Sequence, residues 1–333
     1  MPPWWLRRPL SITAWLILST VCVLLWPVLA GIAQVIGALT GDRRLAIMTR
    51  IFLTYFGREL MTLVTCGFLW LLSGAGLFMR TGWMQALHWR LLRWFVGGIA
   101  DATIGELGIQ VREDASQEAD RALADDGPLI VFSRHAGPGD TILLIDRLLT
   151  HFDRRPSVVF KEAIALDPSI DLIAHRLPHA LLDLDDRAEC EARIARTTRA
   201  LGERGVLLLF PEGGNFTPER RRSALSSLRR RGRWEAVRRG EQLEHVLPPK
   251  PSGALTALAS NPTAGVIFAA HTGLGLAAYP REIWRELPVG GTLYTRMWFV
   301  PRSEVPEDED ERSKWLNDWW QLIDNWIEGR HLE

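Results

Sequence analysis

Residues 128–145 read Pro-Leu-Ile-Val-Phe-Ser-Arg-His-Ala-Gly-Pro-Gly-Asp-Thr-Ile-Leu-Leu-Ile. The apolar run 128–133, the glycine-rich turn after it and the apolar stretch 141–151 are typical of a buried strand, a loop and a helix. The same pattern predicts further strands at 157–160, 206–210 and 265–270, and a helix at 188–204. Strands that alternate with helices predict an α/β fold with a mostly parallel sheet flanked by helices. In such a sheet, the loops that leave the carboxyl ends of the strands carry the functional side chains.

The composition excludes two classes of protein. The chain has 333 residues, 47% of them hydrophobic, which is too apolar for a disordered chain. Its 39 basic residues are balanced by 39 acidic ones, so the positive surplus of a general nucleic-acid binder is missing and we expect no nucleic-acid partner. Cys22, Cys66 and Cys190 are too few and too widely spaced for a disulfide framework or a cysteine metal site. We expect no metal and no cofactor.

Two long charge-free runs near the N-terminus predict a membrane element. Residues 10–39 and 60–79 carry no charged side chain, and about twenty apolar residues suffice to cross a bilayer. The first run is too long for the core of a signal peptide, so we expect it to be retained. Residues 41–59, which contain four arginines, would connect the two runs into a helical hairpin. Because arginines are nearly balanced between the hairpin ends and this connection, a hairpin that enters only one leaflet is the alternative.

Residues 83–95 form a third N-terminal feature. They place tryptophans and leucines at helical spacing, with Arg90 and Arg93 at the margin of the apolar face. This pattern predicts a helix that lies in the headgroup region of a membrane, where tryptophan is favoured. The alternative is a basic helix packed on the soluble domain that follows.

The loop after the first predicted strand holds a candidate proton acceptor. His135 stands at the strand exit, and Asp140 follows it across a compact Ala-Gly-Pro-Gly turn. A histidine can deprotonate a hydroxyl when a carboxylate fixes its tautomer and stabilises the imidazolium. Asp140 is placed to fold back on His135 and to cap the helix that it begins. A loop histidine followed by an unrelated helix cap is the alternative for this loop taken alone.

A second loop makes the pattern specific. Residues 211–217, Pro-Glu-Gly-Gly-Asn-Phe-Thr, follow the strand 206–210, and two glycines after Glu212 let a ligand approach the backbone closely. His-x4-Asp at one strand exit and Phe-Pro-Glu-Gly about seventy residues later resemble the glycerophospholipid acyltransferase family, which contains the lysophosphatidic acid acyltransferases. The resemblance covers roughly residues 105–300, and the two-run N-terminus is similar to the membrane-facing element of some members.

The resemblance implies roles for particular residues. His135 would be the general base that takes the proton of the glycerol hydroxyl, and Asp140 would orient it. Glu212 and Gly213 match the motif that helps to bind the phosphate-bearing acceptor.

Two basic residues match the family segments that bind phosphate. The stretch 181–187, Leu-Leu-Asp-Leu-Asp-Asp-Arg, matches the family segment in which an apolar run leads to an arginine, and Arg187 would be the phosphate ligand. Lys161 follows a predicted strand in a Lys-Glu pair and is the second candidate. For both residues, a solvated surface charge is the alternative.

Residues 245–253, His-Val-Leu-Pro-Pro-Lys-Pro-Ser-Gly, match the fourth block of the family. This version resembles the subgroup with the eukaryotic long-chain lysophosphatidate and lysophosphoinositide acyltransferases. Small residues replace the usual bulky ones in the first motif, and Arg134 stands where asparagine is common. Asn215 replaces an arginine that often follows the glutamate and glycine, which leaves the acceptor head group open.

The resemblance therefore implies a membrane-bound O-acyltransferase. It would move a fatty acyl group from acyl-CoA or acyl carrier protein to a lysophospholipid, with lysophosphatidic acid converted to phosphatidic acid. Residues 1–100 would form the membrane hairpin and interfacial helix, and residues 101–333 the catalytic domain. We expect it in the bacterial plasma membrane with that domain on the cytoplasmic side. The alternatives are a lysophosphoinositide or glycolipid acceptor, or a non-catalytic lipid-binding membrane protein.

Two charge-patterned or apolar segments remain. Residues 219–239 contain nine arginines, which predict either a solvated basic segment or attraction to anionic lipid or acyl-CoA phosphates. Residues 314–328 place three tryptophans and several aliphatic side chains along one helical face. Packing on the core is favoured over membrane contact for this last helix.

Overall fold

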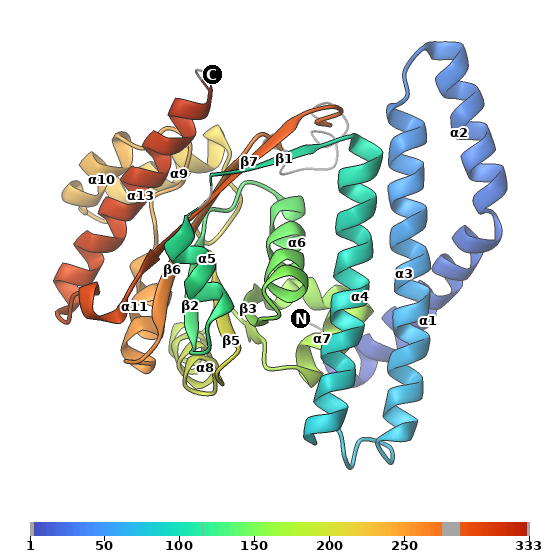
Figure 1. The fold of residues 1–333 in the computed structure, drawn as a ribbon, viewed down its shortest axis with the longest axis horizontal. Coiled ribbons are helices and arrows are strands. Elements are labelled where there is room, and N and C mark those ends of the chain that lie inside the picture. The colour runs from blue at the N-terminus through green and yellow to red at the C-terminus, as the bar shows by residue number, and fades with distance from the viewer. Residues whose placement is uncertain (1–2, 115, 275–286, 332–333) are drawn as a thin grey trace.

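The computed structural model describes residues 3–114, 116–274 and 287–331. The described strands form a seven-stranded sheet in the order β1-β7-β6-β2-β5-β3-β4 (Figure 1). All neighbouring strands are parallel except β6 and β7, which are antiparallel. The prediction of a mostly parallel α/β sheet flanked by helices is confirmed. The strands are β1 Gln110–Asp114, β2 Leu129–Ser133, β3 Arg155–Lys161, β4 Ala180–Leu182, β5 Gly205–Leu209, β6 Gly265–Thr272 and β7 Thr292–Val300.

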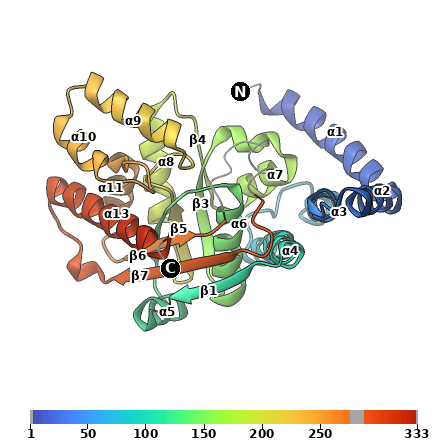
Figure 2. The same ribbon diagram turned by 90° about the horizontal axis from the view of Figure 1, so that it is seen from above.

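Helices cover both faces of the sheet, and the N-terminal helices lie to one side of it (Figures 1 and 2). Four helices precede β1, and α9 to α11 follow one another between β5 and β6. The helices are α1 Trp4–Leu24, α2 Trp26–Thr40, α3 Arg44–Leu72, α4 Gly82–Leu107, α5 Gln117–Ala124, α6 Pro138–Asp146, α7 Pro168–Arg176, α8 Arg187–Arg199, α9 Pro218–Arg230, α10 Trp234–Glu241, α11 Pro251–Ser260 and α13 Glu309–His331. Short π and 3₁₀ turns lie at Arg147–His151, Glu162–Leu166 and Arg302–Glu304.

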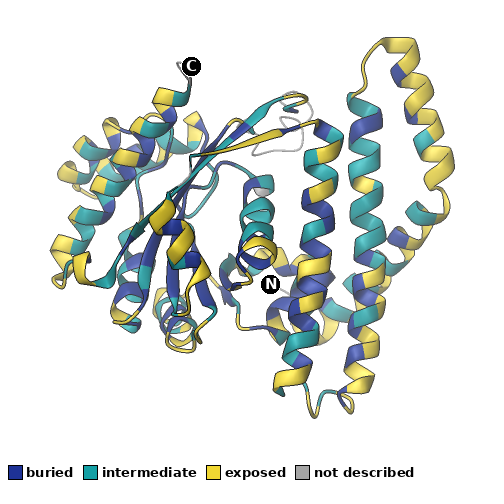
Figure 3. Ribbon diagram, in the orientation of Figure 1, coloured by how far each residue is buried: buried dark blue, intermediate teal, exposed yellow. Residues whose placement is uncertain are grey.

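The central strands read as unbroken apolar runs because both faces of the sheet are covered. In β2, Leu129 and Val131 pack into the cluster beneath α4 and α6, whereas Ile130 and Phe132 pack into the cluster beneath α8, α11 and α13. The other central strands alternate in the same way, since successive side chains point to opposite faces. Figure 3 shows this buried centre. The apolar strands therefore hold the loops at their carboxyl ends on a rigid base.

Helix α3 contains most of the segment that was expected to connect the two membrane runs. The connection predicted at residues 41–59 is helical from Arg44, and the second predicted membrane run continues only to Leu72 before turns over residues 73–80. The helix ends there because Gly74 and Gly76 adopt positive φ angles of 65° and 100°. Arg50, read as a loop charge, lies within the helix, and its Nε is 2.5 Å from Oε2 of Glu106 on α4. The structure does not confirm the membrane hairpin.

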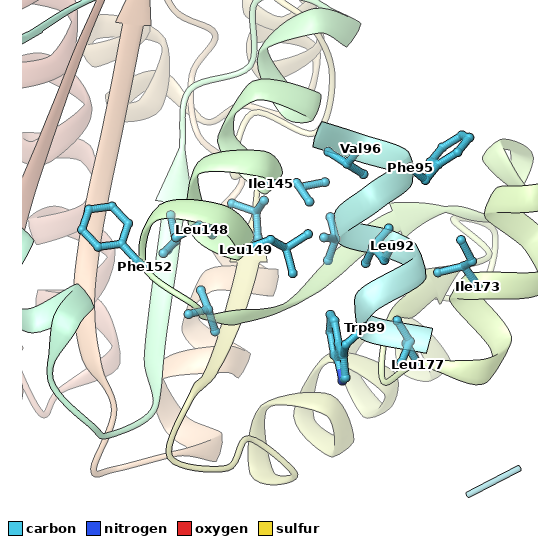
Figure 4. Close-up of a cluster of buried hydrophobic side chains, with 14 of the residues drawn as sticks. Trp89, Leu92, Phe95, Val96, Ile145, Leu148, Leu149, Phe152, Ile173 and Leu177 are labelled. Carbon is cyan, nitrogen blue, oxygen red and sulfur yellow. The ribbon is translucent and has the colours of Figure 1, made fainter. Parts of the chain in front are cut away.

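Helix α4 begins one residue before the segment predicted to lie in a membrane interface and continues to Leu107. It lies between α3 and α6 (Figure 2). Trp89, Leu92 and Val96 pack against Ile145 on α6 and Ile173 on α7, as Figure 4 shows. The predicted helix is present, and the open alternative of a helix packed on the soluble domain describes its apolar face.

By length and composition, α1 is the one described helix that could cross a bilayer. Its N-terminal end is bound to the sheet domain: Nη2 of Arg7 is 2.8 Å from Oδ1 of Asp171 on α7, and Nε of Arg8 is 2.6 Å from Oδ2. Arg7 is buried and also donates to the carbonyl oxygen of Ala165. This end of α1 is therefore fixed to the sheet domain.

The C-terminal helix α13 packs on the core, as favoured from the sequence. Trp320 and Ile323 are fully buried, and the ring of Trp319 stacks on Phe268 of β6 at a centroid distance of 4.4 Å. The tryptophans near the C-terminus thus pack against the sheet.

Candidate active site

The loop after β2 is hydrogen-bonded to the loop after β5 through the backbone of His135. The His135 N–H donates to Oε1 of Glu212 over 2.9 Å, and its carbonyl oxygen accepts the N–H of Phe216 over 2.8 Å. The imidazole lies against the ring of Phe210, with centroids 4.5 Å apart. Two segments more than seventy residues apart in the chain therefore meet at one histidine.

Asp140 is held at the start of α6, where Pro138 favours the first turn. Its Oδ2 accepts the backbone N–H groups of Ala136 and Gly137 over 2.6 and 2.9 Å. Its Oδ1 accepts the N–H and the hydroxyl of Thr141 over 2.5 and 3.1 Å. The turn Ala-Gly-Pro-Gly thus folds the aspartate back, as the spacing predicts.

His135 and Asp140 face each other across this turn. Nδ1 of His135 lies 3.3 Å from Oδ1 and 3.4 Å from Oδ2 of Asp140. Burial by itself would raise the pKa of Asp140, but hydrogen bonds from His135 and a second histidine hold that pKa far below its usual range. A permanently ionised carboxylate favours the proton on Nδ1, which leaves Nε2 free to accept one.

The second histidine is His271, which sequence reasoning missed. It lies near the carboxyl end of β6, and its Nε2 is 3.1 Å from Oδ2 of Asp140. A signal was available, because a histidine directly after a predicted buried strand stands where functional side chains gather. The missing information was the strand order, which places β6 beside β2.

Arg134, which replaces the asparagine usual in the family, is buried beneath these loops. Its Nη1 donates to the carbonyl oxygen of His271 over 2.6 Å, and its Nη2 donates to that of His245 over 3.1 Å. Desolvation lowers the pKa of this guanidinium, and the nearby carboxylates of Glu212, Asp140 and Asp324 oppose the shift. Arg134 therefore joins the ends of β2 and β6 to the fourth-block loop.

Glu212, which was expected to help to bind the acceptor, accepts backbone hydrogen bonds in this structure. Its side chain is buried, and its Oε2 accepts the N–H of Leu247 over 2.8 Å while Oε1 accepts that of His135. Desolvation raises the pKa of Glu212 to about 8, against the effect of these N–H groups and of Arg134. Both carboxylate oxygens bind backbone, so Glu212 positions two loops instead of facing a ligand.

Three cationic side chains surround the glycines that follow Glu212. Gly213 adopts a φ of +68°, and a Cβ atom there would lie 3.0 Å from Nζ of Lys250. A Cβ atom on Gly214 would lie 3.8 Å from Nη1 of Arg220 and 4.0 Å from Nζ of Lys161. Desolvation, followed by Lys250 and Arg220, lowers the pKa of Lys161. We call Lys161, Arg220 and Lys250 the basic cluster.

Comparison with known proteins identifies the family of the central part of the chain. Residues 109–258 match the model of the acyltransferase family. They are an acyltransferase domain. The family is that of the glycerolipid acyltransferases, which includes the lysophosphatidic acid acyltransferases. Neither the curated proteins nor the solved structures gave a match to the chain.

The matched part of the acyltransferase domain contains His135, Asp140, Glu212 and the whole basic cluster, but it ends before β6 and His271. Arg220 and Lys250 of this cluster were missed as ligands from the sequence. Arg220 was read only as part of an arginine-rich segment, and Lys250 only as part of the fourth block. Both reach Gly213 and Gly214 from elements whose proximity depends on the fold.

Arg187 stands apart from this cluster. It begins α8, its side chain is 78% exposed, and its Nε lies 2.8 Å from Oε1 of Glu191. Among the contacts of the described residues, none joins it to Lys161 or to His135. The alternative of a solvated surface charge describes Arg187 in this structure.

A cavity of about 370 Å³ opens beside Asp140. Asp140 and His271 line it together with the apolar side chains of Leu143, Leu293 and Met297. Its size and largely apolar walls are typical of a small-molecule site. Among the described residues, no group of three histidine, cysteine or acidic side chains is arranged to hold a metal ion.

Proposed function

We propose that this chain is a membrane-bound O-acyltransferase that moves a fatty acyl group from acyl-CoA or acyl carrier protein to lysophosphatidic acid, forming phosphatidic acid. One observation carries the proposal. Nδ1 of His135 faces an ionised, fully hydrogen-bonded Asp140, which leaves Nε2 as a proton acceptor in the same loop system as three cationic side chains. The family match supports acyl transfer in general.

The chemistry needs one positioned base. Nε2 of His135 takes the proton of the acceptor hydroxyl while that oxygen attacks the thioester carbonyl carbon. The carbon–sulfur bond breaks, and the departing thiolate receives the proton from His135. Such proton transfer contributes roughly 10²- to 10⁴-fold to the rate, and the anion of Asp140 stabilises the imidazolium in between.

The basic cluster would bind the phosphate of the acceptor. Lys161, Arg220 and Lys250 lie around two glycines, where a ligand can approach the backbone. Guanidinium and ammonium groups bind phosphate through charge-assisted hydrogen bonds. Arg220 also donates to the carbonyl oxygen of Asn215 over 3.1 Å, so an arginine reaches the position where the family often has one. This favours a phosphate-bearing acceptor over a neutral one.

The cavity beside Asp140 and His271 would hold the fatty acyl chain. Its apolar walls exclude water from the reacting carbonyl, and it opens on the carboxylate that orients His135. The donor and the acceptor would therefore reach the base from two sides.

The N-terminal end of α1 would rest on the bilayer. Trp4 and Trp5 are 63% and 62% exposed, and Leu166, in the turn that accepts a hydrogen bond from Arg7, is 56% exposed. Exposed indole and aliphatic side chains favour a membrane interface. The turn that binds Arg7, Glu162–Leu166, follows directly after Lys161, the last residue of β3. We place the protein in the bacterial plasma membrane, with its catalytic domain on the cytoplasmic side.

The decisive experiment supplies labelled acyl-CoA and a panel of lyso-acceptors to the purified full chain in detergent. We expect product with lysophosphatidic acid, loss of at least 10²-fold in His135→Ala, and little change in the control His175→Ala on α7. Equal product from His135→Ala would contradict the assignment of the base.

The same panel separates the other candidate functions. Product with lysophosphoinositide or a glycolipid, but not with lysophosphatidic acid, would keep the chemistry and change the acceptor. No product with any acceptor, together with retained lipid binding, would contradict an enzyme and favour a lipid-binding protein.

A further inference from the structure

Asp140 has two imidazole neighbours, although the proposed reaction needs only one. His271 is 9% exposed, and its Nε2 lies 3.1 Å from Oδ2 of Asp140. The carbonyl oxygen of His271 accepts a hydrogen bond from the buried guanidinium of Arg134. The end of β6 is thus fixed to β2, and His271 is held against the carboxylate.

The two oxygens of Asp140 have different sets of partners. Oδ2 receives the N–H groups of Ala136 and Gly137 and faces His271. Oδ1 receives both donors of Thr141. Nδ1 of His135 lies 3.3 Å from Oδ1 and makes its hydrogen bond with Oδ2 over 3.4 Å. The further partner on Oδ2 from β6 therefore opposes any rotation of the carboxylate that would turn Oδ2 away from His135.

We infer that His271 is a positioning residue for the acyl transfer. Its Nε2–H donates to Oδ2 of Asp140, which keeps the carboxylate directed at His135 and disperses its negative charge. The inference rests on the proposed function, since it concerns the same base. His271 lies beyond the residues that match the acyltransferase family, so this contact comes from a part of the chain outside the match.

The surroundings of His271 determine how a pH measurement would respond. Asp140 faces it from α6, and its Nε2 also lies 3.4 Å from the carbonyl oxygen of Arg134, which follows β2. The guanidinium of Arg134 binds the carbonyl oxygen of His271 and is itself acted on by the carboxylate of Glu212. On β7, the register partner of His271 is the neutral Thr295, next to Arg296. Asp140 is the carboxylate in contact with its ring, so removal of the imidazole acts first on Asp140.

Three full-chain variants test this role. His271→Leu removes the donor, His271→Asn keeps one on a shorter side chain, and Tyr294→Phe alters the opposite strand outside the residues that line the cavity, as a control. We expect kcat to fall about tenfold in His271→Leu, with the KM of donor and acceptor changed less than about twofold. We expect His271→Asn to recover most of the rate and Tyr294→Phe to match the wild type.

The pH dependence gives a readout that a merely structural role would not move. Without the His271 donor, the charge of Asp140 acts more strongly on the imidazolium of His135, so the acid limb of kcat/KM should move to higher pH in His271→Leu. A histidine-selective NMR titration should show the same upward shift for His135 without any assay of activity.

The outcomes separate the two proposals. Unchanged kcat and an unshifted His135 titration in His271→Leu would overturn the role of His271, and so would equal losses in His271→Leu and His271→Asn that follow thermal stability. An inactive wild type would contradict the proposed function, whereas the NMR comparison would still decide the contact.

Discussion

Asp140 and Glu212 are both buried carboxylates, and they belong to the loops that leave two paired strands, β2 and β5. Asp140 accepts three backbone N–H groups and a hydroxyl and faces two imidazoles. Glu212 accepts one backbone N–H on each oxygen. The pKa of Asp140 is held far below its usual range, whereas burial raises that of Glu212 to about 8.

The number and kind of hydrogen-bond donors therefore give these two buried carboxyl groups different pKa values. Burial disfavours the charge of both, and enough hydrogen bonds reverse that effect in one of them. Asp140 remains an anion that can orient and stabilise His135. Glu212 uses both oxygens to hold the His135 loop and the Leu247 loop together. In the proposed reaction, the loop after β2 supplies the base. The loop after β5 supplies the buried carboxylate that holds this base and the glycines around which the basic cluster gathers.

The largest effect should come from Asp140→Asn. The asparagine amide has one acceptor oxygen, whereas the donors around Asp140 now share two carboxylate oxygens. The neutral amide also no longer stabilises the imidazolium of His135. We expect kcat to fall by roughly 10²- to 10⁴-fold in the acyl-CoA assay.

Asp324→Asn is the matched control, because Asp324 is also buried and also accepts backbone N–H groups, those of Glu244, His245 and Val246. It should lower the melting temperature with a far smaller loss of kcat. Equal losses of kcat in the two variants would remove the distinction between a reacting and a supporting carboxylate.

Lys161→Met should produce the next largest effect. It removes one charge of the basic cluster and keeps the length of the side chain. Loss of one charge-assisted hydrogen bond to phosphate predicts a rise of about tenfold in the KM of lysophosphatidic acid, with kcat little changed. Arg187→Gln should leave both constants within about twofold. A rise in KM only for Arg187→Gln would restore the assignment made from the sequence.

Glu212→Gln should act mainly on stability. Glutamine offers one acceptor oxygen to two backbone N–H groups, so its own NH₂ meets one of them, and a buried donor without a partner costs about 1–3 kcal/mol. Chemical denaturation at pH 5 measures this loss. A variant as stable as the wild type would show that the two loops do not depend on Glu212.

The last prediction concerns the pH dependence of stability. With an ordinary pKa of 4.5 raised to about 8, the folded chain binds a proton at Glu212 that the unfolded chain lacks across this interval. Stability from this group should therefore fall as the pH rises from 4.5 towards 8. Denaturation midpoints across this range should decline less steeply in Glu212→Gln. Parallel slopes would contradict the raised pKa.

Much of the fold could be predicted because the central strands are covered on both faces. Their apolar runs at 128–133, 157–160, 206–210 and 265–270 correspond to β2, β3, β5 and β6. Strands β1, β4 and β7 gave no such signal. β1 is polar and largely exposed at the sheet edge, β4 has three residues, and the side chains of β7 are mostly half-buried.

The residues of the candidate site also differ in whether the sequence predicts them. His135 and Asp140 are five residues apart, so a local turn determines their contact and the spacing predicts it. His271 and Lys250 reach the site through strand order and loop packing, which spacing does not encode. The predicted membrane hairpin is not confirmed, and hydropathy does not show that Arg50 pairs with Glu106 or that Arg7 pairs with Asp171.

Asp324 has a consequence for where this enzyme can be shortened. It lies on α13, 66 residues after the family match ends at residue 258, yet its carboxylate binds three successive N–H groups of the loop that also receives Glu212 and Arg134. A chain cut at the boundary of the match would lose this support together with β6 and His271. The smallest working unit should therefore extend through α13, and homologous domains joined to other C-terminal segments would need a different anchor for the same loop.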